Sequence, residues 1–157
     1  MRRKTTNKNK SRKRGPVRSR KVIFDGITFA SGLERYMYQA LKKAKIRCDY
    51  EGRTFTLVEG FNFDNETYER QTNGKGEMVN RGDKKILGIK YTPDFEGKDF
   101  IIECKGRPNE TFPLRWKMFK KYVRENLFGY TLYKPQRQSE CDMVVKLIKD
   151  GKKKISS

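Results

Sequence analysis

The chain has 157 residues, a length typical of one domain with a modest core. Its 38 lysines and arginines outnumber 19 acidic residues, which gives a formal net charge of +19, and it contains no histidine. The missing histidines exclude every triad, relay or zinc site that depends on imidazole. No apolar run approaches the roughly 20 residues of a membrane helix. Three scattered cysteines predict neither a disulfide framework nor a zinc knuckle, which favours a reducing cytoplasm.

Residues 1–21 are predicted to form a disordered basic tail. They carry eleven Lys and Arg side chains and no acidic one, so they cannot bury apolar surface. Such a tail favours contact with a polyanion, because neutralised phosphates release their counterions. A solvated tail or a nuclear address is the alternative. The nucleic-acid contacts expected here are Arg12, Lys13, Arg14, Arg18, Arg20 and Lys21. A second short basic tail is expected over 152–157.

The folded part is predicted to begin with a β-hairpin over 22–29. Its two short apolar segments flank Asp25-Gly26, a pair typical of the type I′ turn. Apolar residues then recur at helical spacing, which predicts a helix over 32–45. Strands are predicted over 47–51 and 53–58.

Residues 60–88 differ from their surroundings, since they contain many turn signals and few apolar residues. We predict an insertion here, either an extended hairpin or a mobile loop. The apolar pattern returns in 89–95 and 100–105. These two segments are predicted to form a hairpin whose second strand is central in a sheet.

The remaining elements are two helices separated by a strand over 128–133. Thr111 is predicted to cap the first helix, with Pro113 in its first turn, and Ser139 to cap the second. The apolar stripe expected on the first helix consists of Leu114, Met118, Phe119 and Tyr122. The order of the elements predicts a small α/β domain over 22–151, with a mixed β-sheet flanked by helices.

Three carboxylates and one lysine are candidates for catalytic chemistry, namely Glu34, Asp94, Glu103 and Lys105. Because side chains alternate along a strand, Glu103 and Lys105 share one face, and the turn after Asp94 brings that residue close to them. Phosphodiester hydrolysis needs a hard cation, for which carboxylates are the preferred ligands. We therefore expect Asp94, Glu103 and the backbone carbonyl of Cys104 to hold Mg²⁺, with Mn²⁺ as a substitute. Lys105 would orient the attacking water or stabilise the phosphate charge.

Each of these residues also has a structural interpretation. Ser31 and Glu34 have the spacing of a capping box. Glu103 and Lys105 can form a solvated pair on a strand, and Asp94 is an ordinary turn residue. An acid and a lysine at the end of a buried strand are nevertheless costly unless they are paired or used.

Taken together, the motifs resemble the signature of a known nuclease superfamily. Thr92-Pro-Asp94, eight further residues and then Glu103-Cys-Lys105 resemble the P-D-x(n)-E-x-K motif of the PD-(D/E)xK nucleases. Ser31-Gly-Leu-Glu34 resembles their upstream helical glutamate. The combination is similar to phage-type endonuclease I, a family that resolves Holliday junctions, and to other small phage nucleases. The resemblance covers residues 24–135, with a longer spacing from Glu34 to Asp94 because of the insertion.

The resemblance implies a restriction-endonuclease-like core and a Mg²⁺-dependent endodeoxyribonuclease that acts on branched DNA in a phage-infected bacterial host. It implies Glu34, Asp94 and Glu103 as metal-binding acids and Lys105 as the catalytic lysine. No small-molecule cofactor and no membrane partner are expected, and a homodimer is one candidate assembly. The DNA contacts expected in the folded part are Arg107, Arg115, Lys117, Lys120 and Lys121.

Three other functions stay open at this point. A basic protein that binds RNA or packages DNA without catalysis would use the charged tail, but it has no need for Asp94, Glu103 and Lys105 in this arrangement. A general phage DNA nuclease would share the chemistry without preferring junctions. A degenerate nuclease fold with a structural role is the third alternative, against which all four motif positions hold residues competent for catalysis.

Overall fold

The computed structural model describes residues 20–106 and 109–155. Within them the fold is mixed α/β, as predicted. The helices are α1 (Gly32–Lys43), α2 (Phe112–Asn126) and α3 (Gln138–Ile155). The central sheet has the strand order β12 (Thr131–Tyr133), β11 (Phe100–Ile102), β10 (Phe95–Glu96) and β3 (Asp49–Tyr50). None of the helices in this part of the chain has the length and apolar character needed to span a membrane.

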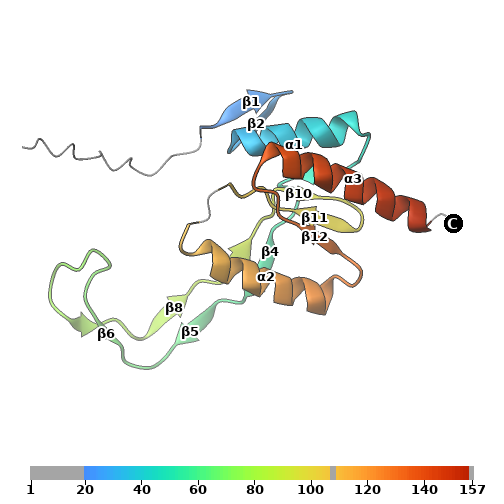
Figure 1. Ribbon diagram of the computed structural model, residues 1–157. Coiled ribbons are helices and arrows are strands. Elements are labelled where there is room, and N and C mark those ends of the chain that lie inside the picture. The colour runs from blue at the N-terminus through green and yellow to red at the C-terminus, as the bar shows by residue number, and fades with distance from the viewer. Residues whose placement is uncertain (1–19, 107–108, 156–157) are drawn as a thin grey trace, which may run out of the picture.

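The central sheet lies between two helical layers (Figure 1). Helices α1 and α3 pack together on one face, and α2 covers the other. Strand β11 is buried on both faces. Phe100 and Ile102 lie in the core beneath α1 and α3, whereas Ile101 lies in the core beneath α2. This division follows from the alternation of side chains along a strand, and it confirms that the second predicted strand is central.

The pairing of the sheet is mixed. Strands β11 and β12 run parallel, joined by α2 as the crossover that a parallel pair requires, and the other neighbours are antiparallel. The hairpin predicted from 89–95 and 100–105 is only partly right. Only Phe95 and Glu96 pair with β11, whereas β9 (Ile89–Tyr91) pairs with β4 (Phe55–Val58). Strands β9 and β10 are separated at Pro93, which has no amide hydrogen to donate to a sheet.

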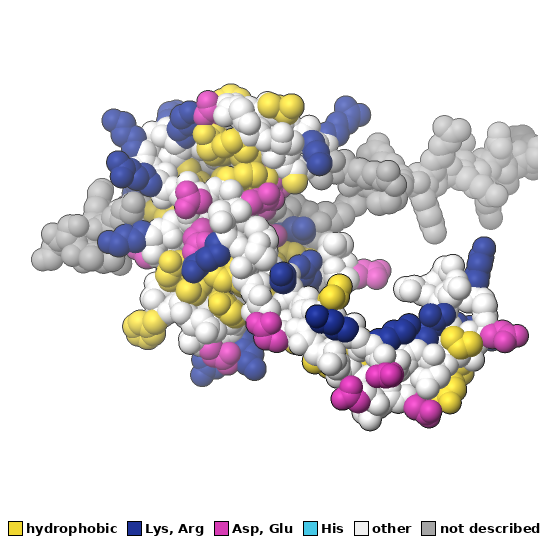
Figure 2. Space-filling view, turned by 180° about the vertical axis from the view of Figure 1, so that it is seen from behind, with side chains coloured by type: hydrophobic (Ala, Val, Ile, Leu, Met, Phe, Trp, Pro, Cys, Tyr) yellow, Lys and Arg dark blue, Asp and Glu magenta, His cyan; other side chains and the backbone are white. Residues whose placement is uncertain are grey.

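Residues 55–91 form a long two-stranded ribbon, and its distal part stands away from the body (Figures 1 and 2). Beyond the β4–β9 pair, the paired strands are β5 (Phe61–Phe63) with β8 (Lys84–Ile86), and β6 (Tyr68–Glu69) with β7 (Val79–Asn80). The strands approach closely at Gly60, where a Cβ would lie 2.9 Å from the Ile86 carbonyl oxygen. The extended-hairpin alternative for 60–88 is therefore confirmed, and we call these residues the arm.

The N-terminal hairpin matches its prediction. Strands β1 (Val22–Phe24) and β2 (Ile27–Phe29) pair around Asp25 and Gly26, whose φ angles of 57° and 75° are both positive. Positive φ at both central residues defines the type I′ turn. Helix α1 follows and ends at Lys43, two residues before the predicted end.

The two later helices differ from their predictions in detail. In α2, Leu114 is 65% exposed, so it does not belong to the buried stripe. The buried residues are Phe112, Trp116, Phe119 and Val123, whose spacing of three and four residues is that of one helix face. Helix α3 begins at Gln138, so Ser139 lies inside the helix rather than at its cap. It continues through Ile155, so most of the segment predicted as a basic tail over 152–157 has a helical backbone.

A candidate active site at the end of the central sheet

One pocket brings together the four residues predicted to be catalytic. Its volume is about 250 Å³, and its lining includes Glu34 from α1, Asp94 from the turn before β10, and Glu103 and Lys105 from the end of β11. The other lining residues are Ala30, Tyr91, Thr92, Cys104, Asn109, Thr111, Phe112 and Arg115. The fold therefore collects the motif residues from separate segments.

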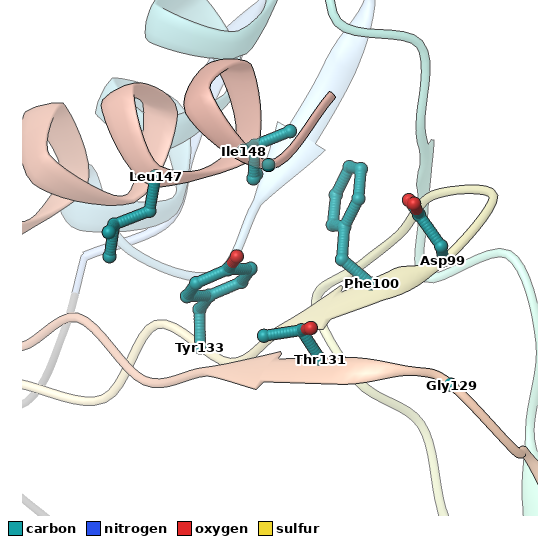
Figure 3. Close-up of a pocket in the computed structure, with 8 residues that line it drawn as sticks. Asp99, Phe100, Gly129, Thr131, Tyr133, Leu147 and Ile148 are labelled. Carbon is teal, nitrogen blue, oxygen red and sulfur yellow. The ribbon is translucent and has the colours of Figure 1, made fainter. Parts of the chain in front are cut away.

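A smaller pocket of about 150 Å³ lies beside the start of β11. Figure 3 shows Phe100 and Tyr133 on the strands and Ile148 on α3 around this space. Its lining contains one carboxylate, that of Asp99. Because metal-assisted chemistry needs several convergent ligands, the pocket at the other end of β11 is the candidate active site.

Glu34 is held in place by hydrogen bonds at the start of α1. Ser31 Oγ accepts from the Glu34 amide at 3.2 Å and donates to Glu34 Oε1 at 2.7 Å. Glu34 Oε2 accepts from the Ala30 amide at 2.9 Å and from the Tyr50 hydroxyl at 2.8 Å. These contacts confirm the capping-box interpretation, with the Ala30 amide in place of the N-cap amide. The same carboxylate lines the pocket, so the two interpretations of Glu34 are compatible.

Asp94 is joined to the end of β11 and shares a desolvated environment with Glu103. Asp94 Oδ2 accepts from the Cys104 amide at 2.5 Å. Burial raises the pKa of Asp94, and the charges of Glu103 and Glu34 raise it further. Burial also raises the pKa of Glu103, against the opposing effects of the Tyr91 hydroxyl and the Lys105 ammonium. Both shifts mean that the ionised carboxylates are costly here, a cost that a bound cation relieves.

The alternation of β11 continues past its last residue. The Glu103 amide donates to the Tyr133 carbonyl at 2.9 Å and the Lys105 amide to the Pro135 carbonyl at 3.0 Å. Cys104 packs with Ile102 in the core beneath α1 and α3. Glu103 and Lys105 line the pocket, and Lys105 Nζ lies 4.9 Å from the centre of the Phe112 ring on α2. The predicted division of the two faces is confirmed.

The donor set of the pocket fits a hard divalent cation, although its ligands are not preassembled. Within residues 20–106 and 109–155, no three acidic or cysteine side chains stand close enough together to hold a metal. Formally, three carboxylates face two cationic side chains, Lys105 and Arg115, so the lining carries one net negative charge when all are ionised. A dication would turn this into one net positive charge. Carboxylate and carbonyl oxygens are the ligands that Mg²⁺ prefers.

Sequence analysis missed three polar residues of the site. Tyr50 anchors Glu34, and nothing local in the sequence marks it for that role. Asn109 Oδ1 accepts from the Phe112 amide at 2.9 Å, whereas Thr111 occupies the N-cap position without a side-chain cap. Asparagine is a strong capping residue, so its position just before the helix was a usable signal. Tyr91, adjacent to the Thr92-Pro-Asp94 motif, also lines the pocket.

The basic residues predicted to contact nucleic acid fall into two groups. Those that the structure describes are all exposed, namely Arg20, Lys21, Arg115, Lys117, Lys120 and Lys121. Those that lie outside the described residues are Arg12, Lys13, Arg14, Arg18 and Arg107. Within the first group, Arg115 lines the pocket.

The fold and the pocket define a small mixed α/β protein with an acidic site at the end of its central sheet. The chain belongs to the family described as Protein of unknown function (DUF1064), which it matches over residues 14–136. No curated protein and no solved structure matches the chain.

Proposed function

We propose that this protein is a divalent-cation-dependent endodeoxyribonuclease with a PD-(D/E)xK core. The observation that carries the proposal is the convergence of Glu34, Asp94, Glu103 and Lys105 on one pocket. Glu34 and Glu103 are only 5% and 7% exposed. Buried carboxylates without cationic partners in hydrogen-bond contact are costly to a fold, and a metal-dependent activity accounts for keeping them.

Each of the four convergent residues has a role in the proposed chemistry. Asp94 and Glu103, with the Cys104 carbonyl, would hold Mg²⁺, which supplies positive charge to offset that of a phosphodiester in the transition state. Lys105 donates from the same strand face, either to the attacking water or to the phosphate oxygens. Glu34 contributes a third carboxylate, whose orientation is fixed by its hydrogen bonds at the start of α1.

The test is cleavage of DNA by the full chain. Supercoiled plasmid, linear duplex and a synthetic four-way junction are incubated with Mg²⁺, with Mn²⁺ or with EDTA. We expect cleavage with either metal and none with EDTA, and Asp94→Asn should abolish it while leaving DNA binding intact or tighter, because one anion is removed. Asp99→Asn is the matched control, since Asp99 lies outside the site near the other end of β11. Full cleavage by Asp94→Asn contradicts the assignment.

The same assay separates the substrate alternatives. Faster cleavage of the four-way junction than of linear duplex supports a resolving activity on branched DNA, and equal rates support a general nuclease. Binding of every substrate without cleavage under any condition supports the non-catalytic alternative, for which the net charge of +19 is the specific observation.

A further inference from the structure

Arg115 differs in placement from the other basic residues of α2. Its guanidinium donates to the Lys90 carbonyl and lies 5.8 Å from the centre of the Tyr91 ring, so it is held against β9 and lines the pocket. A helix turns by about 100° per residue. Arg124, nine residues further along α2, therefore projects half a turn away from Arg115, on a different side of the helix.

Among the described residues, no carboxylate forms an ion pair with Arg115 to compensate its charge. The four ion pairs in this part of the chain join other side chains. A guanidinium has five N–H donors in a planar fork, and the bond to the Lys90 carbonyl uses one of the terminal nitrogens. The remaining donors suit the paired oxygens of a phosphate group.

The N-terminus of α2 lies on the same wall of the pocket. Thr111 and Phe112, at the first turn of this 15-residue helix, are lining residues. The Phe112 amide already donates to Asn109, and Pro113 has no amide hydrogen, so the helix offers an anion the positive end of its dipole rather than a free first amide. Lys105 leans toward this wall, since its Nζ lies over the Phe112 ring.

A second, independent observation points to a ligand at this wall. Tyr91 is 5% exposed, and its hydroxyl has no hydrogen-bond partner in the part of the chain that the structure describes. The hydroxyl is near enough to Glu103 to lower the pKa of that carboxyl, but without the geometry of a hydrogen bond. A buried hydroxyl without a partner costs free energy. Because Tyr91 lines the pocket beside Arg115, an oxygen-bearing ligand in the pocket would satisfy its hydroxyl.

We propose that Arg115, the N-terminus of α2 and the Tyr91 hydroxyl form a phosphate-binding subsite, which positions a DNA phosphodiester beside the carboxylates of the same pocket. This inference rests on the proposed function, because it assigns a nucleic-acid strand to the pocket. Arg115 thereby acts at the reacting phosphate, whereas the exposed lysines of α2 contact the phosphate backbone outside the pocket.

The subsite is tested without cleavage. The full chain carrying Asp94→Asn, which lowers the negative charge of the pocket, is labelled with ¹⁵N and titrated with inorganic phosphate in EDTA. We expect saturable shifts of the Arg115 Nε–H and Phe112 amide signals, with an affinity lowered about tenfold or more by adding Arg115→Gln. Adding Arg124→Gln is the matched control and should leave the affinity unchanged. Equal weakening by both changes, or no saturable shift, overturns the proposal.

A second pair of variants keeps the test decisive. Arg115→Lys retains the charge but not the fork, so it should bind phosphate with intermediate affinity, and it replaces Arg115→Gln if that variant does not fold. Tyr91→Phe should weaken phosphate binding, and unchanged binding would remove Tyr91 from the subsite. Phosphate binding that depends on Arg115 in a protein that cleaves no DNA would contradict the nuclease assignment and leave the subsite standing. Cleavage of DNA without Arg115-dependent phosphate binding would support the nuclease assignment and overturn the subsite.

Discussion

Glu34 lies at the start of α1 and also lines the pocket. Its capping role and its proposed role in the metal site can be separated by substitution. Glu34→Gln keeps a side chain that serves in a capping box, so the melting temperature should change little. If the carboxylate belongs to the metal site, the same change should lower the cleavage rate by orders of magnitude. The measurement is a thermal melt together with a single-turnover cleavage assay.

Ser31→Ala is the complementary variant. It removes the cap hydroxyl at a cost of about 1 kcal/mol and so lowers the melting temperature, while it keeps the carboxylate. Cleavage should fall far less than in Glu34→Gln. Normal cleavage by Glu34→Gln would leave Glu34 with the capping role alone.

The raised pKa values of Asp94 and Glu103 imply a pH dependence of stability in the metal-free protein. Between the ordinary pKa of a carboxyl group and the raised values, the folded state binds more protons than the unfolded state. The free energy of unfolding should therefore fall as the pH rises through this interval. Urea denaturation in EDTA from pH 4.5 to 8 should show this fall, and Asp94→Asn should flatten it and raise stability at neutral pH.

The same carboxylates predict that Mg²⁺ stabilises the folded protein. By binding the ionised carboxylates of the folded state, it should raise the melting temperature of the unsubstituted chain at neutral pH. The rise should be much smaller in Asp94→Asn, and Asp99→Asn serves as the control. Parallel pH profiles of the free energy of unfolding for the unsubstituted chain, Asp94→Asn and Asp99→Asn would show that Asp94 does not cause the pH dependence.

Helices and strands could be predicted from the sequence where their formation depends on neighbouring residues. Asp25-Gly26 predicts the first hairpin because its turn type depends on those two residues, and the apolar run at 100–102 predicts a central strand. The partner of β9 was missed because β4 lies beyond the arm in sequence, and no local pattern encodes a pairing across that distance. The cap of α2 was assigned to Thr111 because spacing alone does not show which side-chain oxygen reaches the first amide.

The sequence only partly predicts that the four candidate residues lie in one pocket. The alternation along β11 places Glu103 and Lys105 on one face from sequence alone. The approach of Glu34 depends on how α1 packs against the sheet, and Tyr50 fixes its carboxylate from a strand whose two residues carry no distinctive pattern. Such tertiary contacts are decided by packing rather than by local propensity.

The distal part of the arm, residues 64–83, should be dispensable for folding. No residue of 60–88 belongs to either hydrophobic core cluster among the described residues. Phe63 and Lys84 are cross-strand partners, so a two-residue Asn-Gly turn can replace 64–83 without changing the register. We expect this variant to melt within a few degrees of the full chain. A drop of ten degrees or more would mean that the arm packs against the body.

In the whole molecule, positive charge is concentrated in residues 1–21, which have no part in the proposed chemistry. Deleting residues 1–21 removes eleven positive charges. The dependence of log affinity for DNA on log salt should become shallower, by nearly one unit for each phosphate that the protein no longer neutralises. Turnover at saturating DNA and low salt should persist, because the four catalytic candidates lie elsewhere.

Binding of the full chain and of residues 22–157 is measured across a salt series, with junction and duplex in parallel. Any preference for the junction should persist without the tail, because phosphate contacts position a protein without selecting its substrate. Identical salt slopes would show that residues 1–21 do not touch DNA. Loss of the preference would show that they recognise shape.

Three consecutive amides beside the pocket, those of residues 103–105, are bonded alternately to two other segments of the chain. Their acceptors are the Tyr133 carbonyl, the Asp94 carboxylate and the Pro135 carbonyl. Local fluctuations release segments whose backbone bonds are few and exposed, whereas this segment continues β11, all three residues of which are buried. The floor of the pocket should therefore open only with the global unfolding of the domain, so any ligand that enters meets a rigid surface.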